Sequence, residues 1–234
     1  MANELIGHVA LVTGGGRGFG KAIAKAFAAE GAAVTITART TRQIDTTVAE
    51  IKAAGGKAFA VPGDVTSRKD VERVIIATHR HFGPTTLLVN GASVITPSGA
   101  LGTIDPDEWW NAQAVHIRGP FLYVSGVLPE MIRSRKGRII SVASPGFSEL
   151  GMGLGMGKAS QIRLTEQLAL EGQPHGISAF AIARDAEDAA RLEQTATACV
   201  RLASGRYDGL SGRHLAPDDD FDALLTAALS SAPN

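Results

Sequence analysis

Residues Val9–Ala24 read VALVTGGGRGFGKAIA, an apolar run that passes through glycines into an alanine-rich segment. The pattern predicts a buried strand, a tight turn and a helix. At such a turn, backbone N–H groups can approach a pyrophosphate at the helix N-terminus, where the helix dipole favours negative charge. We therefore expect the turn to bind phosphate groups.

Two common phosphate-binding patterns fit this turn poorly. The spacing G-x-G-x-x-G fails if it starts at Gly14, because Phe19 holds the last glycine position. A P-loop can be aligned from Gly15 to Lys21, but Ala22 then stands where a serine or threonine would hold magnesium. The pattern that remains is Thr13-Gly14-x-x-x-Gly18-Phe19-Gly20.

Short apolar runs alternate with longer amphipathic segments along the rest of the chain. This alternation predicts an α/β fold: a doubly wound Rossmann-type parallel sheet with helices on both faces, in a single domain spanning residues 1–234. The expected strands are His8–Thr13, Ala33–Ala38, Lys57–Val61, Thr86–Asn90, Gly137–Val142, Ile177–Ile182 and Ser211–Leu215. The expected helices are Gly18–Glu30, Thr41–Ala54, Arg68–Phe82, Asp105–Arg135, Gly157–Gly172, Ala186–Ala203 and Asp218–Ser230. The stretch Gly151–Gly157 (GMGLGMG) is expected to form a flexible loop.

Composition narrows the possible partners and the compartment. The chain has 234 residues, 44% of them hydrophobic, with 23 basic and 23 acidic side chains. A balanced charge provides no field for nucleic acid or an anionic membrane, so a small-molecule substrate or other subunits are expected. The single cysteine, Cys199, cannot form an intramolecular disulfide, and the N-terminal segment has no long apolar run. We expect a cytoplasmic protein.

Further motifs follow the glycine turn in a fixed order. Together they resemble the short-chain dehydrogenase/reductase (SDR) family over nearly the whole chain. The resemblance implies a dinucleotide cofactor, with the carboxylate of Asp64 against the adenine amino group and the amide of Val65 beside it. The motifs that carry it, besides Thr13–Gly20, are Gly63-Asp64-Val65, Asn90-Gly91-Ala92-Ser93, Val115–Phe121 (VHIRGPF), Gly137–Ser144 (GRIISVAS) and Lys158–Glu171.

Charge at the end of the second expected strand indicates which cofactor is bound. An acidic residue there would bond the ribose 2′-hydroxyl, whereas a basic residue would accommodate a 2′-phosphate. Arg39 stands at this position, Arg42 follows, and Arg17 lies within the glycine turn. Because guanidinium groups form charge-assisted hydrogen bonds to phosphate, NADP is favoured over NAD. The predicted cofactor-binding residues are Gly14, Arg17, Gly18, Phe19, Gly20, Arg39, Asp64, Val65, Asn90, Gly91, Ala92 and Lys158.

The resemblance also implies four groups around the nicotinamide: a tyrosine for proton transfer, a lysine, a serine that bonds the substrate oxygen, and an asparagine that helps hold a relay water. Lys158 and Ser144 match the lysine and the serine. Leu154 stands four residues before Lys158, where the tyrosine belongs, and His116 replaces the asparagine. The two tyrosines of the chain, Tyr123 and Tyr207, do not fit the motif. The predicted catalytic residues are therefore Ser144, Lys158 and His116.

The substrate region also departs from the family pattern. Residues Ala183-Arg184-Asp185 lead at once into an expected helix, where the family has an insertion over the substrate, so the region around 183–190 is shortened. Three hypotheses stay open: an NADP-dependent oxidoreductase of alcohols or carbonyls that uses His116 for proton transfer; a non-redox lyase, isomerase or cyclase that uses His116 and Ser144; and a catalytically silent dinucleotide-binding protein. The family resemblance implies a homodimer or homotetramer. No metal site is expected, since His79 and His81 at a helix end favour a dipole interaction.

Overall fold

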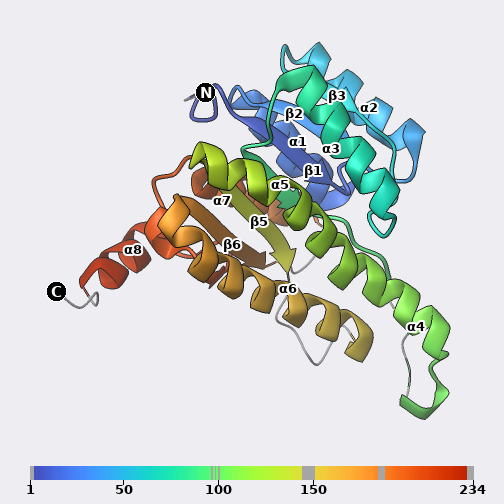
Figure 1. The fold of residues 1–234 in the computed structure, drawn as a ribbon. Coiled ribbons are helices and arrows are strands. Elements are labelled where there is room, and N and C mark those ends of the chain that lie inside the picture. The colour runs from blue at the N-terminus through green and yellow to red at the C-terminus, as the bar shows by residue number, and fades with distance from the viewer. Residues whose placement is uncertain are drawn as a thin grey trace.

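The computed structural model describes residues 3–95, 97, 99, 101–143, 151–183 and 188–230, without the side chains of residues 101 and 151–154. Within these residues, seven strands form one parallel sheet in the order β3-β2-β1-β4-β5-β6-β7 (Figure 1). The strands are β1 (Val9–Thr13), β2 (Ala33–Thr37), β3 (Lys57–Ala60), β4 (Leu87–Asn90), β5 (Gly137–Ala143), β6 (Ile177–Ala183) and β7 (His214–Leu215).

Helices connect successive strands. The α-helices are α1 (Gly18–Ala29), α2 (Thr41–Ala53), α3 (Arg68–Phe82), α4 (Pro106–Gln113), α5 (Gly119–Ser134), α6 (Gly151–Gly172), α7 (Ala189–Ala203) and α8 (Phe221–Ser230). A π-helical turn, η2 (Ala114–Arg118), joins α4 to α5, and short 3₁₀ turns occur at η1 (Leu101–Thr103), η3 (Gln173–His175) and η4 (Asp208–Leu210). None of the described helices is both long and apolar enough to cross a membrane.

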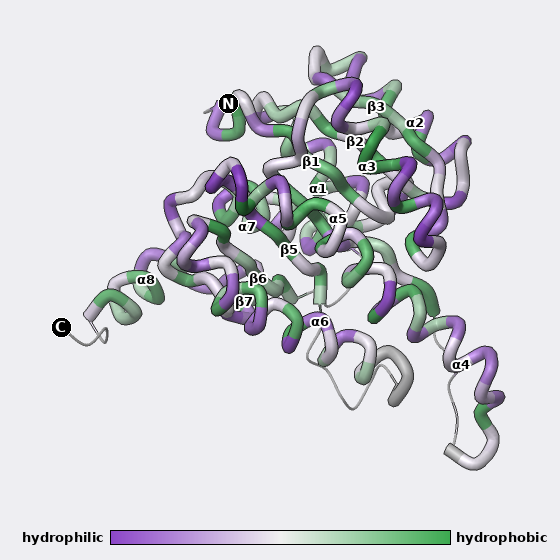
Figure 2. Tube along the Cα trace, in the orientation of Figure 1, coloured by the Kyte–Doolittle hydropathy of each residue, from purple (hydrophilic) through white to green (hydrophobic). Residues whose placement is uncertain are grey.

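The sheet separates two apolar clusters, because alternate residues of a strand point to opposite faces. On one face, Ala10 and Val12 of β1 pack with apolar residues of α1, α2 and α7. On the other face, Leu11 packs with apolar residues of α3, α5 and α6. Both faces of the sheet are therefore covered, and Figure 2 shows the hydrophobic segments gathered along the strands. The predicted doubly wound fold is confirmed.

The strand order reverses direction between β1 and β4. The chain winds outward from β1 through β2 to β3 on one side, and outward from β4 through β5, β6 and β7 on the other. In an open parallel sheet, the crevice beyond the carboxyl ends of the two strands at this switch point is the expected ligand site. In this chain the two strands end at Thr13 and Asn90.

Two predicted elements differ from the structure. The single helix expected over Asp105–Arg135 is divided by η2, which precedes Gly119 and Pro120. Pro120 has no N–H to continue the α-helical hydrogen bonds of the preceding turn. The loop expected at Gly151–Gly157 is wrong, because these residues begin α6. At Gly157, packing accounts for the glycine: an added Cβ would lie 2.6 Å from the Cβ of His116. Tertiary contact here outweighs the low helix propensity of glycine.

Candidate functional site

Thr13 joins the two strand ends at the switch point. Its side chain is 2% exposed, and its hydroxyl donates to the carbonyl of Val89 at 3.2 Å. The same oxygen accepts the backbone N–H groups of Gly91 at 3.1 Å and Ala92 at 3.2 Å. One buried hydroxyl thus holds the turn after β4 against the end of β1.

The glycine turn leaves little room for side chains. Gly14 has a φ of +71°, and an added Cβ would lie 2.7 Å from the Cα of Ala92. An added Cβ at Gly20 would lie 2.4 Å from the carbonyl oxygen of Gly14. Gly18, with a φ of +53°, is the first residue of α1. The backbone can therefore approach a ligand closely at the α1 N-terminus, where the dipole favours an anion.

Phe19 and Arg17 have different environments in this turn. The side chain of Phe19 is 3% exposed and belongs to the apolar cluster beneath α1, so it anchors the helix where the strict motif has glycine. Arg17 is the N-cap residue of α1, is exposed, and makes no side-chain capping bond. The Arg17 guanidinium is thus presented beside the helix N-terminus.

Arg39 follows the carboxyl end of β2 and is exposed. It lines a groove of about 440 Å³ together with residues of the turn after β4 and of α4 and η2. The other lining residues are Val94, Ile95, Pro97, Glu108, Asn111, Ala112 and Val115. The basic residue predicted to select the cofactor therefore lies in a hollow at the carboxyl edge of the sheet.

Asp64 and Val65 follow β3 in a tight turn. The Asp64 carboxylate accepts the backbone N–H and the hydroxyl of Thr66, both at 2.8 Å. The backbone N–H of Asp64 donates to the carboxylate of Asp70 at 3.0 Å, and this bond, with help from Arg73, holds the pKa of Asp70 below its usual range. Val65 is buried, at 7% exposure. These hydrogen bonds give Asp64 a structural role in the turn after β3.

Asn90 ends β4 at the switch point with its side chain 2% exposed. Within the described part of the chain, neither its amide oxygen nor its amide nitrogen has a hydrogen-bond partner. A buried amide without partners costs free energy, and a ligand that bonded Asn90 would recover part of this cost. It adjoins Gly91 and Ala92, the other residues predicted from this motif.

Lys158 and His116 lie in the interior between α6 and η2, with exposures of 1% and 0%. The Lys158 ammonium donates to the carbonyl of Val142, near the end of β5, at 2.7 Å. The His116 Nε2 lies 3.2 Å from the carbonyl oxygen of Val94. Because a carbonyl oxygen can only accept, Nε2 carries the hydrogen in this bond.

Four other residues considered for the catalytic centre do not test the assignment directly. Ser144 lies outside the described residues, as does the side chain of Leu154 in α6. Tyr123 is fully buried in the apolar cluster beneath α5, and burial raises its pKa. Tyr207 accepts a bond from Arg201 at 2.8 Å and donates to Asp222 at 3.2 Å, near α8. The two tyrosines are thus placed in the interior rather than at the motif position.

Sequence reasoning missed several polar residues of this region. Thr13 is predicted only as part of a motif, and the sequence predicts no role for Gln113, Gln161 or Thr165, although all four are at most 2% exposed. For the three helical residues, the available signal is a polar residue at helical spacing from apolar neighbours, a pattern that many surface positions share. His81, which the sequence predicts at a helix end, stacks its ring on Phe59 with ring centroids 4.2 Å apart.

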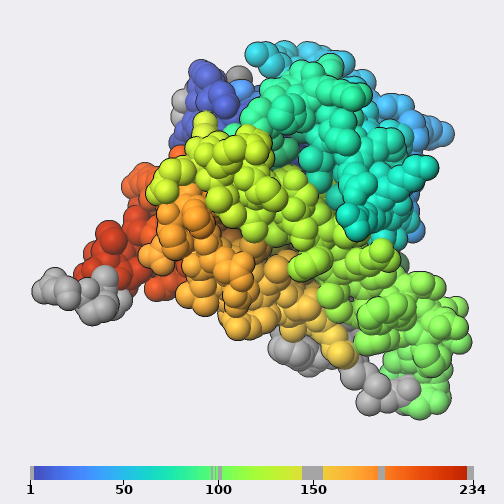
Figure 3. Space-filling view, in the orientation of Figure 1, coloured from blue at the N-terminus to red at the C-terminus, as the bar shows by residue number. Residues whose placement is uncertain are grey.

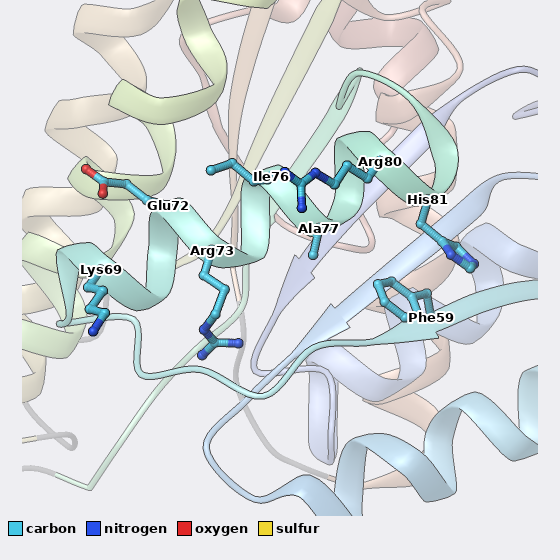
Figure 4. Close-up of a pocket in the computed structure, with 8 residues that line it drawn as sticks. All are labelled: Phe59, Lys69, Glu72, Arg73, Ile76, Ala77, Arg80 and His81. Atoms are coloured by element: carbon cyan, nitrogen blue, oxygen red, sulfur yellow. The ribbon is translucent and has the colours of Figure 1, made fainter.

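A second hollow, of about 600 Å³, lies along the outer side of α3 and contains none of the predicted site residues (Figure 4). Arg73 there donates to the carbonyl of Pro62 and to the carboxylate of Asp70, each at 2.8 Å. The hollow is lined by Phe59, Lys69, Glu72, Arg73, Ile76, Ala77, Arg80 and His81. The predicted residues that the structure describes lie instead at or beyond the carboxyl ends of β1 to β4, or on η2 and α6.

Comparison with known proteins agrees with this geometry. The family model described as short chain dehydrogenase matches residues 8–198. The chain belongs to the short-chain dehydrogenase family. A short chain dehydrogenase of Pseudocercospora fijiensis is 35% identical over 187 residues, which cover 76% of this chain and 59% of that protein. A 3-oxoacyl-[acyl-carrier-protein] reductase of Synechocystis sp. is 34% identical over 76% of this chain and 74% of that protein.

Two further comparisons extend the family assignment. A 2,5-dichloro-2,5-cyclohexadiene-1,4-diol dehydrogenase of Sphingobium indicum is 41% identical over 62% of this chain and 57% of that protein. The chain thus spans less than two thirds of the length of two of these relatives. The crystal structure of a metagenomic short-chain oxidoreductase in complex with NADP superposes with a TM-score of 0.83 at 29% identity, covering 91% of this chain and 97% of that one.

Proposed function

We propose that the protein is an NADP-dependent oxidoreductase of an alcohol or carbonyl group in a small molecule, with an altered proton-transfer centre. The observation that carries the proposal is the cradle at the switch point. Gly14 lies so close to Ala92 that no side chain fits between them, and the α1 N-terminus opens beside it. Backbone so exposed at a helix N-terminus is suited to a pyrophosphate.

The residues around this cradle fit NADP. Backbone N–H groups near Gly18 and Gly20 would hold the pyrophosphate, while Asn90, buried without a partner in the described chain, would bond the ribose. Arg17 and Arg39 supply two exposed guanidiniums for a 2′-phosphate. The solved relative named above, a complex with NADP, supports the same assignment. NAD is the less favoured cofactor.

Bound NADP would supply the hydride acceptor or donor of the reaction. The chain itself would hold the nicotinamide ribose through the Lys158 ammonium and the substrate oxygen through Ser144. Since the His116 Nε2–H is engaged with the Val94 carbonyl, the neutral imidazole carries its lone pair on Nδ1. We assign proton transfer to this atom, because Leu154 at the motif tyrosine position has no proton to give.

A catalytically silent dinucleotide-binding protein is the second candidate, favoured by the complete burial of His116. A buried imidazole that bonds a backbone carbonyl can serve structure alone. The non-redox lyase, isomerase or cyclase proposed from the same residues shares the pocket but has no separate observation in its favour.

The quaternary structure proposed is a homodimer or homotetramer. Trp110, Ile117 and Phe121 are 61%, 39% and 58% exposed along α4, η2 and α5. The segment that contains α4 projects from the rest of the molecule (Figure 3). Exposed apolar side chains on one helical segment favour burial against another subunit. The small-molecule substrate and the cytoplasmic location stay predictions. The shortened region around 183–190 also stays a prediction, since residues 184–187 lie outside the described chain.

Turnover of NADPH with a panel of aldehydes and ketones tests the proposal. Wild-type protein should oxidise NADPH, with a rate that changes between pH 5 and 8, where an imidazole titrates. His116→Ala should lower the rate by about 10² to 10⁴-fold, the usual contribution of general acid–base catalysis.

Leu154→Tyr separates the two candidates. An inactive wild type that gains turnover in Leu154→Tyr would show that the missing phenol limits the reaction, and would remove His116 from the proton-transfer role. Inactivity of both proteins, with NADP binding retained, would support the silent protein.

A further inference from the structure

Gln161 lies between two residues of the proposed centre. It is 1% exposed, on the same helix as Lys158 and one turn after it. Its side-chain oxygen accepts from the Lys158 ammonium at 3.4 Å, and its side-chain nitrogen donates to the backbone carbonyl of His116 at 2.9 Å. The two ends of one amide therefore join α6 to the π-helical turn.

The orientation of this amide follows from its neighbours. An ammonium group only donates and a backbone carbonyl only accepts. The oxygen of Gln161 must therefore face Lys158, and the nitrogen must face His116. A flipped amide would place donor against donor and acceptor against acceptor at a buried position, where unmatched polar groups are costly.

The backbone carbonyl of His116 lies where Pro120 interrupts the α-helical hydrogen-bond pattern. In an α-helix it would accept the N–H four residues on, but that residue is Pro120, which has no N–H. The π-helical geometry of Ala114–Arg118 fits this local failure of the α-helical pattern. The Gln161 side chain supplies a donor at this point.

Burial makes these contacts consequential. A charged ammonium in the interior must be surrounded by acceptors, and Lys158 has the Val142 carbonyl at 2.7 Å and the Gln161 oxygen. Loss of the Gln161 side chain would remove one acceptor from Lys158 and one donor from the His116 carbonyl together. A hydrophobic replacement of similar size could fill the space without restoring either bond.

We propose that Gln161 is a positioning residue that fixes the Lys158 ammonium against the turn carrying His116, so that the lysine acts as a held cation in the cofactor site. This inference deepens the proposed function and rests on it for its consequence in catalysis. The hydrogen-bonded arrangement itself is open to a test that needs no turnover.

The test is NMR of the full chain with ¹⁵N-labelled lysine side chains, with the Lys158 signal assigned by its loss in Lys158→Met. A buried, bonded ammonium exchanges its protons slowly with water. Gln161→Leu should accelerate exchange at Lys158 by about tenfold or more, because a hydrogen bond to a charged group is lost. It should also weaken NADPH binding by about tenfold.

Two further variants separate positioning from general loosening. Gln161→Glu keeps an oxygen facing Lys158, so its lysine exchange should be as slow as in the wild type. Thr165→Val removes another buried hydroxyl of α6, which bonds the Gln161 backbone at 2.9 Å, and should leave lysine exchange and NADPH affinity unchanged.

Unchanged exchange in Gln161→Leu, or equal acceleration in Thr165→Val, would overturn the inference. If Gln161→Leu does not fold, fast exchange in Gln161→Glu would overturn it alone. A wild type that shows slow Lys158 exchange but binds no NADPH would refute the proposed function and leave the positioning role of Gln161 standing.

Discussion

Replacement of Thr13 by valine removes one oxygen from the junction between β1 and β4. Valine has the same shape, so packing is conserved, while the Gly91 and Ala92 N–H groups lose their acceptor and the Val89 carbonyl loses a donor. At roughly 1 kcal/mol for each net hydrogen bond, Thr13→Val should cost about 2–4 kcal/mol of unfolding free energy. For a chain of this length, 1 kcal/mol corresponds to about 2 °C, so Tm should fall by about 4–8 °C.

The measurement is urea and thermal unfolding of the protein without nucleotide, with Thr13→Ser as the matched control. Serine keeps the hydroxyl and loses one methyl group, for about 1 kcal/mol. The valine variant should therefore be the less stable of the two. A valine variant as stable as the serine variant would show that these three bonds do not hold the switch point together.

Three other perturbations have defined outcomes. Gly14→Ala should lower the free energy of unfolding in urea by about 1–3 kcal/mol more than Gly55→Ala, because both glycines have a positive φ but only Gly14 is crowded. Equal losses in the two variants would contradict the close approach of Gly14 to Ala92. Burial, aided by Lys136 and Arg138, lowers the pKa of His8 to about 4. The free energy of unfolding should therefore decline as pH falls from 6.5 toward 4, and His8→Gln should flatten this decline. An unchanged pH slope in His8→Gln would refute the role of His8. Burial raises the pKa of Cys199, so a thiol reagent should label it only after unfolding, and rapid labelling of folded protein would contradict its placement.

The fold could be predicted because each strand is a short apolar run and each helix has a one-sided apolar pattern. The predicted helix Arg68–Phe82 coincides with α3, and the structure shows that Ser67 caps this helix and Gly83 ends it. The helical state of Gly151–Gly157 could not be predicted, since glycine has a low helix propensity and the packing of Gly157 against His116 joins residues that are distant in the chain. The division of the predicted helix Asp105–Arg135 at η2 was also missed, because the apolar pattern continues through this region although Pro120 interrupts the backbone hydrogen bonds.

The candidate site was predicted where motifs mark the ends of strands. Gly14 and Arg39 follow the carboxyl ends of β1 and β2, and Asn90 is the last residue of β4. The order of the motifs in the sequence predicts this placement. The bonds of Thr13 and Gln161 could not be predicted, because each joins residues from separate elements. Local spacing contains no information about which carbonyl a buried amide will meet.

Calorimetric titration with NADP and with NAD tests the central claim most directly. Wild-type protein should bind NADP at least about tenfold more tightly, since each charge-assisted bond contributes roughly 1.5–3 kcal/mol before desolvation. Arg39→Asp should erase or reverse the preference, while Arg80→Asp, the same charge change at the hollow along α3, should leave it intact. Equal affinities for the two nucleotides in the wild type, or no binding of either, would contradict the account.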